Sequence, residues 1–376
     1  MPITLNGDTG ITTPMYNGSI TANAVTPSVN MKNRIINGAM VIDQRNAGAS
    51  VTQTAAAVYT LDRWQMFGDV TSKFSVQQDA GNVTRPAGFT DYLGVTSLSA
   101  YTLGTDERFF IRHKIEGYNV ADLNFGTANA RTVTLSFLVR SSLTGTFGGS
   151  LQNGAGDRSY PFTFTISSAN TWETKTITIA GDTSGTWLTT NGIGLVVNFG
   201  LGVQGSTYAG TAGAWNSNNN YSATGATSVV GTNGATFYIT GVQLEVGSTA
   251  TSFDYRPYGT ELVLCQRYAQ RFGGDASYSA IGFGFGDSTN GWVDAQVTPP
   301  TWMRTVPSVT SSGSFRVVPP DNTSGLAVTG ISINSSTTSS KLFYIICTAS
   351  SVTGFRGYVL RADNSTSAYI LFSAEL

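Results

Sequence analysis

The spacing of apolar residues is the feature that most constrains this chain. Short runs of β-branched and aromatic residues are separated by glycine and asparagine. In TVTLSFLV, Val133, Leu135, Phe137 and Val139 alternate with small hydroxyl residues. A period of two is the pattern of a half-buried antiparallel strand. Alternating or fully apolar runs recur at 108–117, 131–142, 160–167, 171–180, 192–202 and 235–247. Such runs predict an all-β fold, with a jelly-roll β-sandwich at residues 34–259.

The 376 residues are enough for two domains and a shorter appendage. Residues 1–33 are rich in Thr, Asn, Gly and Pro and are too short to form a core, so we expect an extended arm that docks on another protein. A helical pattern runs from about Thr260 to Phe272 and is followed by two glycines. We therefore expect a short linking helix at 260–274 and a second, C-terminal β-sandwich at 275–376.

Composition excludes several classes of partner. Charged residues make up 11% of the chain and the net charge is -1, so no basic surface is expected for nucleic acid or an anionic membrane. The chain contains no run of 18 or more apolar residues, so no membrane span is predicted. The first residues lack the pattern of a signal peptide, and we therefore expect synthesis in a cytoplasm. An aromatic fraction of 11% favours a folded chain over a disordered one.

The sequence offers little of the machinery of an enzyme. His113 is the only histidine, and alternation places it on one face with apolar neighbours, which favours a core or sheet-surface histidine over a catalytic one. Cys265 and Cys347 lie in apolar runs and are expected to be buried, reduced thiols. One histidine and two distant cysteines do not form a usual zinc site, and no nucleophile elbow or phosphate-binding loop is present. We expect no catalysis, no cofactor and no metal.

Carboxylates and oxygen-rich loops leave two alternatives open. Glycoside hydrolases use a pair of acidic residues as catalytic groups. Loops such as 153–157 and 182–187 resemble simple cation sites. Ordinary Asx turns are favoured for both loops. The acidic residues lie at strand ends or beside basic residues, which favours solvated or ion-paired groups over a catalytic pair: Asp106, Glu107, Glu116, Glu173 and Glu245.

The long segment 203–234 is nearly free of charge and mixes aromatic with amide residues. Loops of this length in compact domains are usually functional or disordered. Aromatic rings pack on the C–H faces of sugars, and amides bond their hydroxyls. Aromatic residues that pin the loop are the alternative interpretation. The predicted ligand-binding residues are Tyr208, Trp215, Asn218, Asn219, Asn220 and Tyr221.

Several segments resemble a known family. RIING, IDQR and YTLDRW, all within 34–64, resemble the start of the sandwich domain in tail-fibre-like proteins of bacteriophages and prophages. The stretch from Phe237 to Phe272 resembles the end of that domain and the lead into a tip domain, and the final SAEL resembles the end of such tips.

The resemblance implies a structural virion fibre displayed on the particle exterior. The arm would dock on a tail, neck or baseplate protein, the jelly roll would be like carbohydrate-binding modules, and the tip would meet the host. We expect the contact to be multivalent binding of a host surface glycan, first through loops of the C-terminal domain and second through 203–234. It also implies a homotrimer. Asp43, Arg45, Asp62 and Arg63 are then expected to pair near Trp64 and pin the first strands. The alternatives are a head or neck fibre or decoration protein, and a glycan-depolymerising tailspike.

Overall fold

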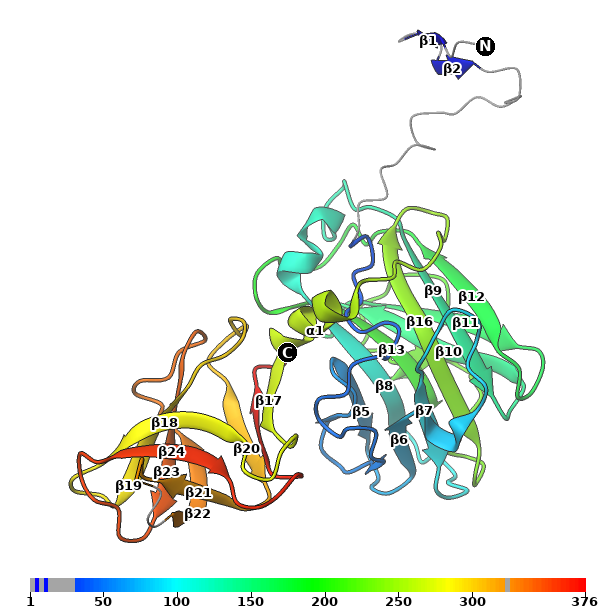
Figure 1. Ribbon diagram of the computed structural model, residues 1–376. Coiled ribbons are helices and arrows are strands. Elements are labelled where there is room, and N and C mark those ends of the chain that lie inside the picture. Colours follow the sequence, from blue (N-terminus) through cyan, green and yellow to red (C-terminus); the bar gives the residue numbers. More distant parts are fainter. Residues whose placement is uncertain (1–3, 7–9, 13–30, 322–324) are drawn as a thin grey trace.

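The computed structural model describes residues 4–6, 10–12, 31–321 and 325–376 (Figure 1). Strands make up almost all of its regular structure, which confirms the all-β class. In the predicted arm, β1 (Thr4–Asn6) pairs antiparallel with β2 (Gly10–Thr12). Most of the remaining arm lies outside the described residues.

The larger domain is a sandwich of two antiparallel six-stranded sheets. All six runs predicted from alternation form strands: β8, β9, β11, β12, β13 and β16. One sheet has the order β11 (Ser159–Ile166), β10 (Gly145–Gln152), β13 (Ile193–Val203), β8 (Arg108–Glu116), β5 (Trp64–Gly68), β4 (Val58–Tyr59). The other has the order β12 (Glu173–Ile179), β9 (Val133–Ser141), β16 (Thr236–Val246), β7 (Leu93–Ser97), β6 (Phe74–Gln78), β3 (Val51–Thr52).

Aromatic side chains fill the space between the two sheets. Phe137 from β9 and Phe199 from β13 contact edge to face with ring centroids 5.1 Å apart. Trp64 is fully buried and contacts His113 at 5.3 Å. The ring of His113 is hydrogen-bonded to the Ile36 carbonyl at 2.9 Å, and burial lowers its pKa well below the usual value. Of the two places expected for this histidine, the core is the one it occupies.

The segment after β13 crosses the outer face of its own sheet. Its two short strands, β14 (Ala209–Gly210) and β15 (Ser222–Ala223), pair in parallel. Ser222 lies so close that a Cβ atom on Gly148 or Gly200 would be 2.4 or 2.7 Å from its Oγ. Glycine at these positions lets the segment lie directly on the sheet. Three short 3-10 helices complete the domain: η1 (Ala80–Asn82), η2 (Gly117–Asn119) and η3 (Ala121–Leu123).

The predicted linking helix is only half right. The helix α1 (Tyr258–Gln266) ends early, and β17 (Ala269–Gly273) follows, so a helix up to residue 272 is wrong. β17 pairs along its whole length with β25 (Tyr369–Ser373). That partner lies about a hundred residues away, so the local helical pattern carried no sign of it. Among the described residues, every helix is too short or too polar to pass through a bilayer.

The C-terminal domain has two packed parts. β20 (Ser308–Ser312) joins β25 and β17 in a three-stranded sheet. This sheet packs on a larger one, with the rings of Phe372 and Phe343 4.4 Å apart, as expected for layered sheets. The larger sheet closes into a barrel, which the sequence did not predict: β18 (Ala280–Gly286), β19 (Trp292–Val297), β23 (Phe343–Ala349), β22 (Leu326–Ile333), β21 (Phe315–Val318), β24 (Gly357–Ala362).

A buried ionic junction joins the domains beside α1, where the C-terminus lies (Figure 1). The Glu375 carboxylate pairs with Arg45 at 3.0 Å and also with Arg63. The guanidinium of Arg63 lies over the Tyr268 ring, 3.6 Å from its centroid. Glu116 of the sandwich accepts from Arg267 at 2.6 Å. The end of the chain is therefore fastened to the first domain.

The predicted pairing within the DQR and LDRW segments is wrong. Both arginines pair with Glu375, from the far end of the chain. Asp62 instead accepts the backbone N–H of Gln44 at 2.6 Å and its side-chain amide at 2.7 Å. Asp43 accepts backbone N–H groups of its own turn. Four of the segments that carry the family resemblance thus meet at one junction.

Burial of Asp62 makes the junction sensitive to pH. Burial raises the pKa of its carboxyl to about 7. Because this pKa is higher in the folded state than in the unfolded state, the folded state binds the proton more tightly. The contribution of Asp62 to the free energy of unfolding therefore rises as the pH falls from 7 towards 4. Buried His113 acts in the opposite direction below pH 6.5. We expect the free energy of unfolding of Asp62→Asn, relative to the native chain, to drop by about 1–3 kcal/mol between pH 7.5 and 5 in urea titrations. An unchanged difference would contradict this.

Candidate functional site

Two of the three predicted amides of the ligand loop are hydrogen-bonded to side chains of the sheet beneath it. Asn220 is buried and accepts from the Ser159 hydroxyl at 3.3 Å. Asn219 accepts from the side-chain amide of Gln152 at 2.9 Å. Asn218 is exposed and lines an open hollow of about 450 Å³. Of the predicted amides, Asn218 is the one that faces this hollow.

The aromatic residues of the loop hold it against the sheet. Trp215 contacts Tyr160, Trp187 and Phe125, with centroids 5.3, 5.4 and 5.9 Å away. Its indole N–H donates to the Ala180 carbonyl at 2.7 Å. This geometry fits the alternative interpretation, in which rings pin the loop.

The two tyrosines of the loop are arranged in a similar way. Tyr221 is stacked on Phe110 at 4.6 Å and contacts Tyr208 at 5.8 Å. The Arg108 guanidinium lies over both tyrosine rings, at 4.5 and 4.2 Å. A binding role for this loop stays a prediction.

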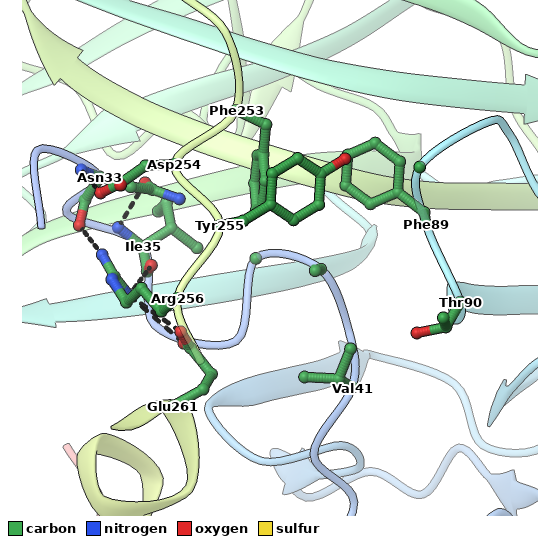
Figure 2. A pocket seen from close by; sticks show the side chains of 13 residues that line it. Asn33, Ile35, Val41, Phe89, Thr90, Phe253, Asp254, Tyr255, Arg256 and Glu261 are labelled. Atoms are coloured by element: carbon green, nitrogen blue, oxygen red, sulfur yellow. Dashed lines mark hydrogen bonds and ion pairs between the residues drawn. The ribbon is translucent and has the colours of Figure 1, made fainter. Parts of the chain in front are cut away.

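A second hollow, of about 170 Å³, lies where the sandwich domain begins and ends. Figure 2 shows its aromatic wall, formed by Phe89, Phe253 and Tyr255. The Phe89 ring lies 5.1 Å from that of Phe253 and 5.4 Å from that of Tyr255. The wall could receive an apolar group or one face of a small ring.

The charged groups of this hollow are already paired, as the dashed lines in Figure 2 show. Arg256 donates to the Ile35 carbonyl at 3.2 Å and pairs with Glu261 at 3.3 Å. The Asp254 carboxylate accepts the backbone N–H of Met31 at 2.9 Å and that of Asn33 at 3.2 Å. These contacts fasten the two ends of the domain together and leave few polar groups for a ligand.

A third hollow, of about 580 Å³, opens on the C-terminal barrel. In β21, Phe315 and Val317 face the barrel core, and this alternation turns Arg316 outward. In β24, Leu360 and Ala362 are buried in the same way, which turns Arg361 outward. We call this hollow the tip pocket; it is lined by Tyr278, Arg316, Arg361, Asp363 and Asn364.

The tip pocket combines an aromatic ring with basic, acidic and amide side chains. The Tyr278 side chain is 53% exposed, and the Arg361 guanidinium lies 5.2 Å from its ring centroid. Arg316 pairs with Asp363 at 2.8 Å. Asn364 follows in a left-handed turn with φ of 48°. The pocket therefore offers a ring face, hydrogen-bond donors and a carboxylate acceptor towards solvent.

Backbone hydrogen bonds fix the loops that carry these groups. The Asp363 N–H donates to the Ser314 carbonyl, and the Ser365 N–H to the Ser277 carbonyl, both at 2.9 Å. The sequence predicted a β-sandwich at 275–376 but gave no indication of this pocket. The sequence held no local signal for it, because Arg316 and Arg361 become neighbours only through the pairing of β21 with β24.

The other candidate groups named from the sequence are engaged elsewhere. Asp182 pairs with Arg158 at 2.7 Å, and Asn153 caps its own turn, so the favoured Asx-turn interpretation of both loops is confirmed. Glu116 lies in the junction, and Glu245 accepts from Gln243 at 2.8 Å. Both cysteines are buried and free of disulfides. Among the described residues, no cluster of three potential metal ligands occurs.

Comparison with known proteins adds structural neighbours at low similarity. No family model matches the chain, and neither does any curated protein. The enzymatically active domain of tailspike protein 4 from bacteriophage CBA120 is 10% identical, with a TM-score of 0.33, and the match covers 57% of this chain and 21% of that one. The chain thus spans about a fifth of that neighbour.

Carbohydrate-binding modules are also among the neighbours. A family 4 module is 16% identical, with a TM-score of 0.28, over 56% of this chain and 98% of the module. A family 11 module from Clostridium thermocellum, in complex with a mixed-linked tetrasaccharide, is 10% identical, with a TM-score of 0.26, over 54% of this chain and 98% of the module. Because these TM-scores are low, the neighbours carry no argument about function, which we base on the geometry of the sites.

Proposed function

We propose that this chain is a non-enzymatic structural fibre protein on the exterior of a phage virion, and that its C-terminal domain attaches the particle to host surface glycans. The single observation that carries the proposal is the tip pocket. Tyr278 offers a ring for the C–H face of a sugar, while Arg361 and Asp363 offer a donor and an acceptor for its hydroxyls. The pocket is open and broad, which suits one or two sugar units of a longer chain.

The rest of the molecule suits an adhesive role. A single open sugar site binds weakly, because much of the ligand stays in water. The homotrimer implied by the family resemblance would present three such sites, and linked sites raise avidity by about 10²–10⁴. The arm at 1–33 would then fasten the trimer to a tail, neck or baseplate protein.

Adsorption separates this function from its alternatives. Purified protein is expected to bind host cells, to compete with infection, and to lose binding when surface glycans are removed. Absence of adsorption and of competition would favour a head or neck fibre or a decoration protein. A fall in glycan mass during incubation would show hydrolysis and would favour a depolymerising tailspike. Such enzymes usually need two carboxylates, and one carboxylate lines the tip pocket.

A further inference from the structure

We infer that the glycan site continues beyond the tip pocket, along the outer face of β24 and β18, and that the C-terminal domain therefore binds an internal stretch of several sugar units. This inference rests on the proposed function. The two strands pair antiparallel and lie side by side (Figure 1). Arg361 of the tip pocket is the partner of Ala280 in this pairing, so the pocket lies at one end of the strand pair.

Two phenylalanine rings lie on the outer face of these strands. In β18, Gly284 is buried, and the alternation of the strand turns Phe283 and Phe285 outward, where they are 47% and 57% exposed. Their ring centroids are 5.3 Å apart in an edge-to-face contact. On β24, a Cβ atom at Gly357 would lie 3.2 Å from the Phe283 ring, so glycine leaves room for that ring beside the strand.

The rings continue the line of the tip pocket. On β24, Arg361, Val359 and Gly357 occupy every second position and share the outer face. Val359 pairs with Phe283, and the next outward residue, Gly357, pairs with Phe285. Four residues of extended strand separate the two ends of this line, a distance of about 13 Å. Together with the tyrosine of the pocket, the phenylalanines therefore present three aromatic rings along a line that is longer than one sugar ring.

Polar side chains lie along the other edge of the two rings. On β19, Gln296 pairs with Phe283 and Asp294 pairs with Phe285. The alternation of β19 turns both polar side chains to the face that carries the rings. The Tyr344 hydroxyl of β23 donates to the side-chain oxygen of Gln296 at 3.3 Å. Rings that receive C–H faces, beside amide, carboxylate and hydroxyl groups that bond sugar hydroxyls, suit a saccharide chain.

The apolar area of this face is too small for a stable protein interface. A third phenylalanine, Phe355, is 82% exposed, and its N–H donates to the carbonyl of Gly286 at the end of β18 at 2.8 Å. The three phenylalanine side chains together expose about 400 Å² at most. A stable interface between proteins buries about 800 Å² on each partner. Separate rings with polar groups beside them therefore suit a saccharide better than a second copy of this chain.

Competition for host-cell adsorption of the full chain tests the inference. The probes are fragments of the host surface polysaccharide, cut by mild acid and sorted by length, with concentrations counted in sugar units. We expect fragments of six units to compete at least ten times better than fragments of two units. Equal competition at every length would overturn the inference while the proposed function stands. Absence of competition by every fragment would overturn both.

Two variants and a matched control complete the test. In Phe283→Ala and Phe285→Ala, we expect the advantage of the long fragments to fall about tenfold, while two-unit fragments, which the tip pocket holds, compete as before. Phe283→Leu and Phe285→Leu remove the ring but keep apolar bulk, and they serve if the alanine variants do not fold. Trp302→Ala removes a 63% exposed ring of the same domain outside both strands and should keep the full advantage.

Two outcomes of the variants would contradict the inference. One is an equal loss of the length advantage in Trp302→Ala. The other is a lower oligomeric mass of the phenylalanine variants in solution with the length advantage intact, which would show that a second copy of the chain covers the rings.

Discussion

Arg63→Ala is expected to lower the free energy of unfolding by about 3–5 kcal/mol, because it leaves the Glu375 carboxylate buried with one partner fewer. The Arg63 side chain is 1% exposed and that of Glu375 is 6% exposed, so water cannot replace the lost contact. The same substitution removes the cation–π contact with Tyr268. Urea unfolding at pH 7.5 measures the effect.

The control is an exposed pair in the same chain. Arg356→Ala breaks a pair whose members are 36% and 50% exposed, and we expect a loss below about 1 kcal/mol. Glu375→Gln keeps the shape of the junction and serves if Arg63→Ala does not fold. Equal losses for Arg63→Ala and Arg356→Ala, together with no effect of Glu375→Gln, would show that the junction is not an important stabilising contact.

Trp215→Ala is expected to cost about 2–4 kcal/mol of stability, since a half-buried ring leaves a gap among Tyr160, Trp187 and Phe125. Thermal unfolding and host-cell adsorption should be measured together. A structural role predicts lower stability while adsorption below the unfolding temperature is kept. Unchanged stability with lost adsorption would instead support the ligand role predicted from the sequence. Asn233→Ala, at an exposed position outside the predicted ligand-binding residues, is the matched control in the same loop.

The sandwich strands were predictable because alternation is a local signal. In β9 and β12 one face packs against the opposite sheet, so apolar residues recur at every second position, whereas β13 and β16 are buried on both faces and are recognisable as longer apolar runs. The turn interpretation of residues 153–157 and 182–187 also held, because Asx turns depend on neighbours within a few positions.

The junction and the tip pocket could not be predicted from the sequence, because both depend on contacts between residues far apart in the chain. Glu375 meets Arg63 across 312 positions, and no local pattern pairs them. Arg316 and Arg361 become neighbours only through the register of β21 and β24. In the same way, β17 forms because β25 is there to pair with it, which overrides a helical pattern at residues 269–272. Long-range pairing decided each of these features.

Adsorption of Tyr278→Ala to host cells is the most direct test of the tip pocket as the glycan contact. The Tyr278 side chain is 53% exposed, so its removal should leave folding intact. Tyr118→Ala, at a tyrosine that is 61% exposed in the other domain, is the matched control. We predict at least tenfold weaker adsorption for Tyr278→Ala and native adsorption for Tyr118→Ala. Native adsorption by a folded Tyr278→Ala protein would contradict the account.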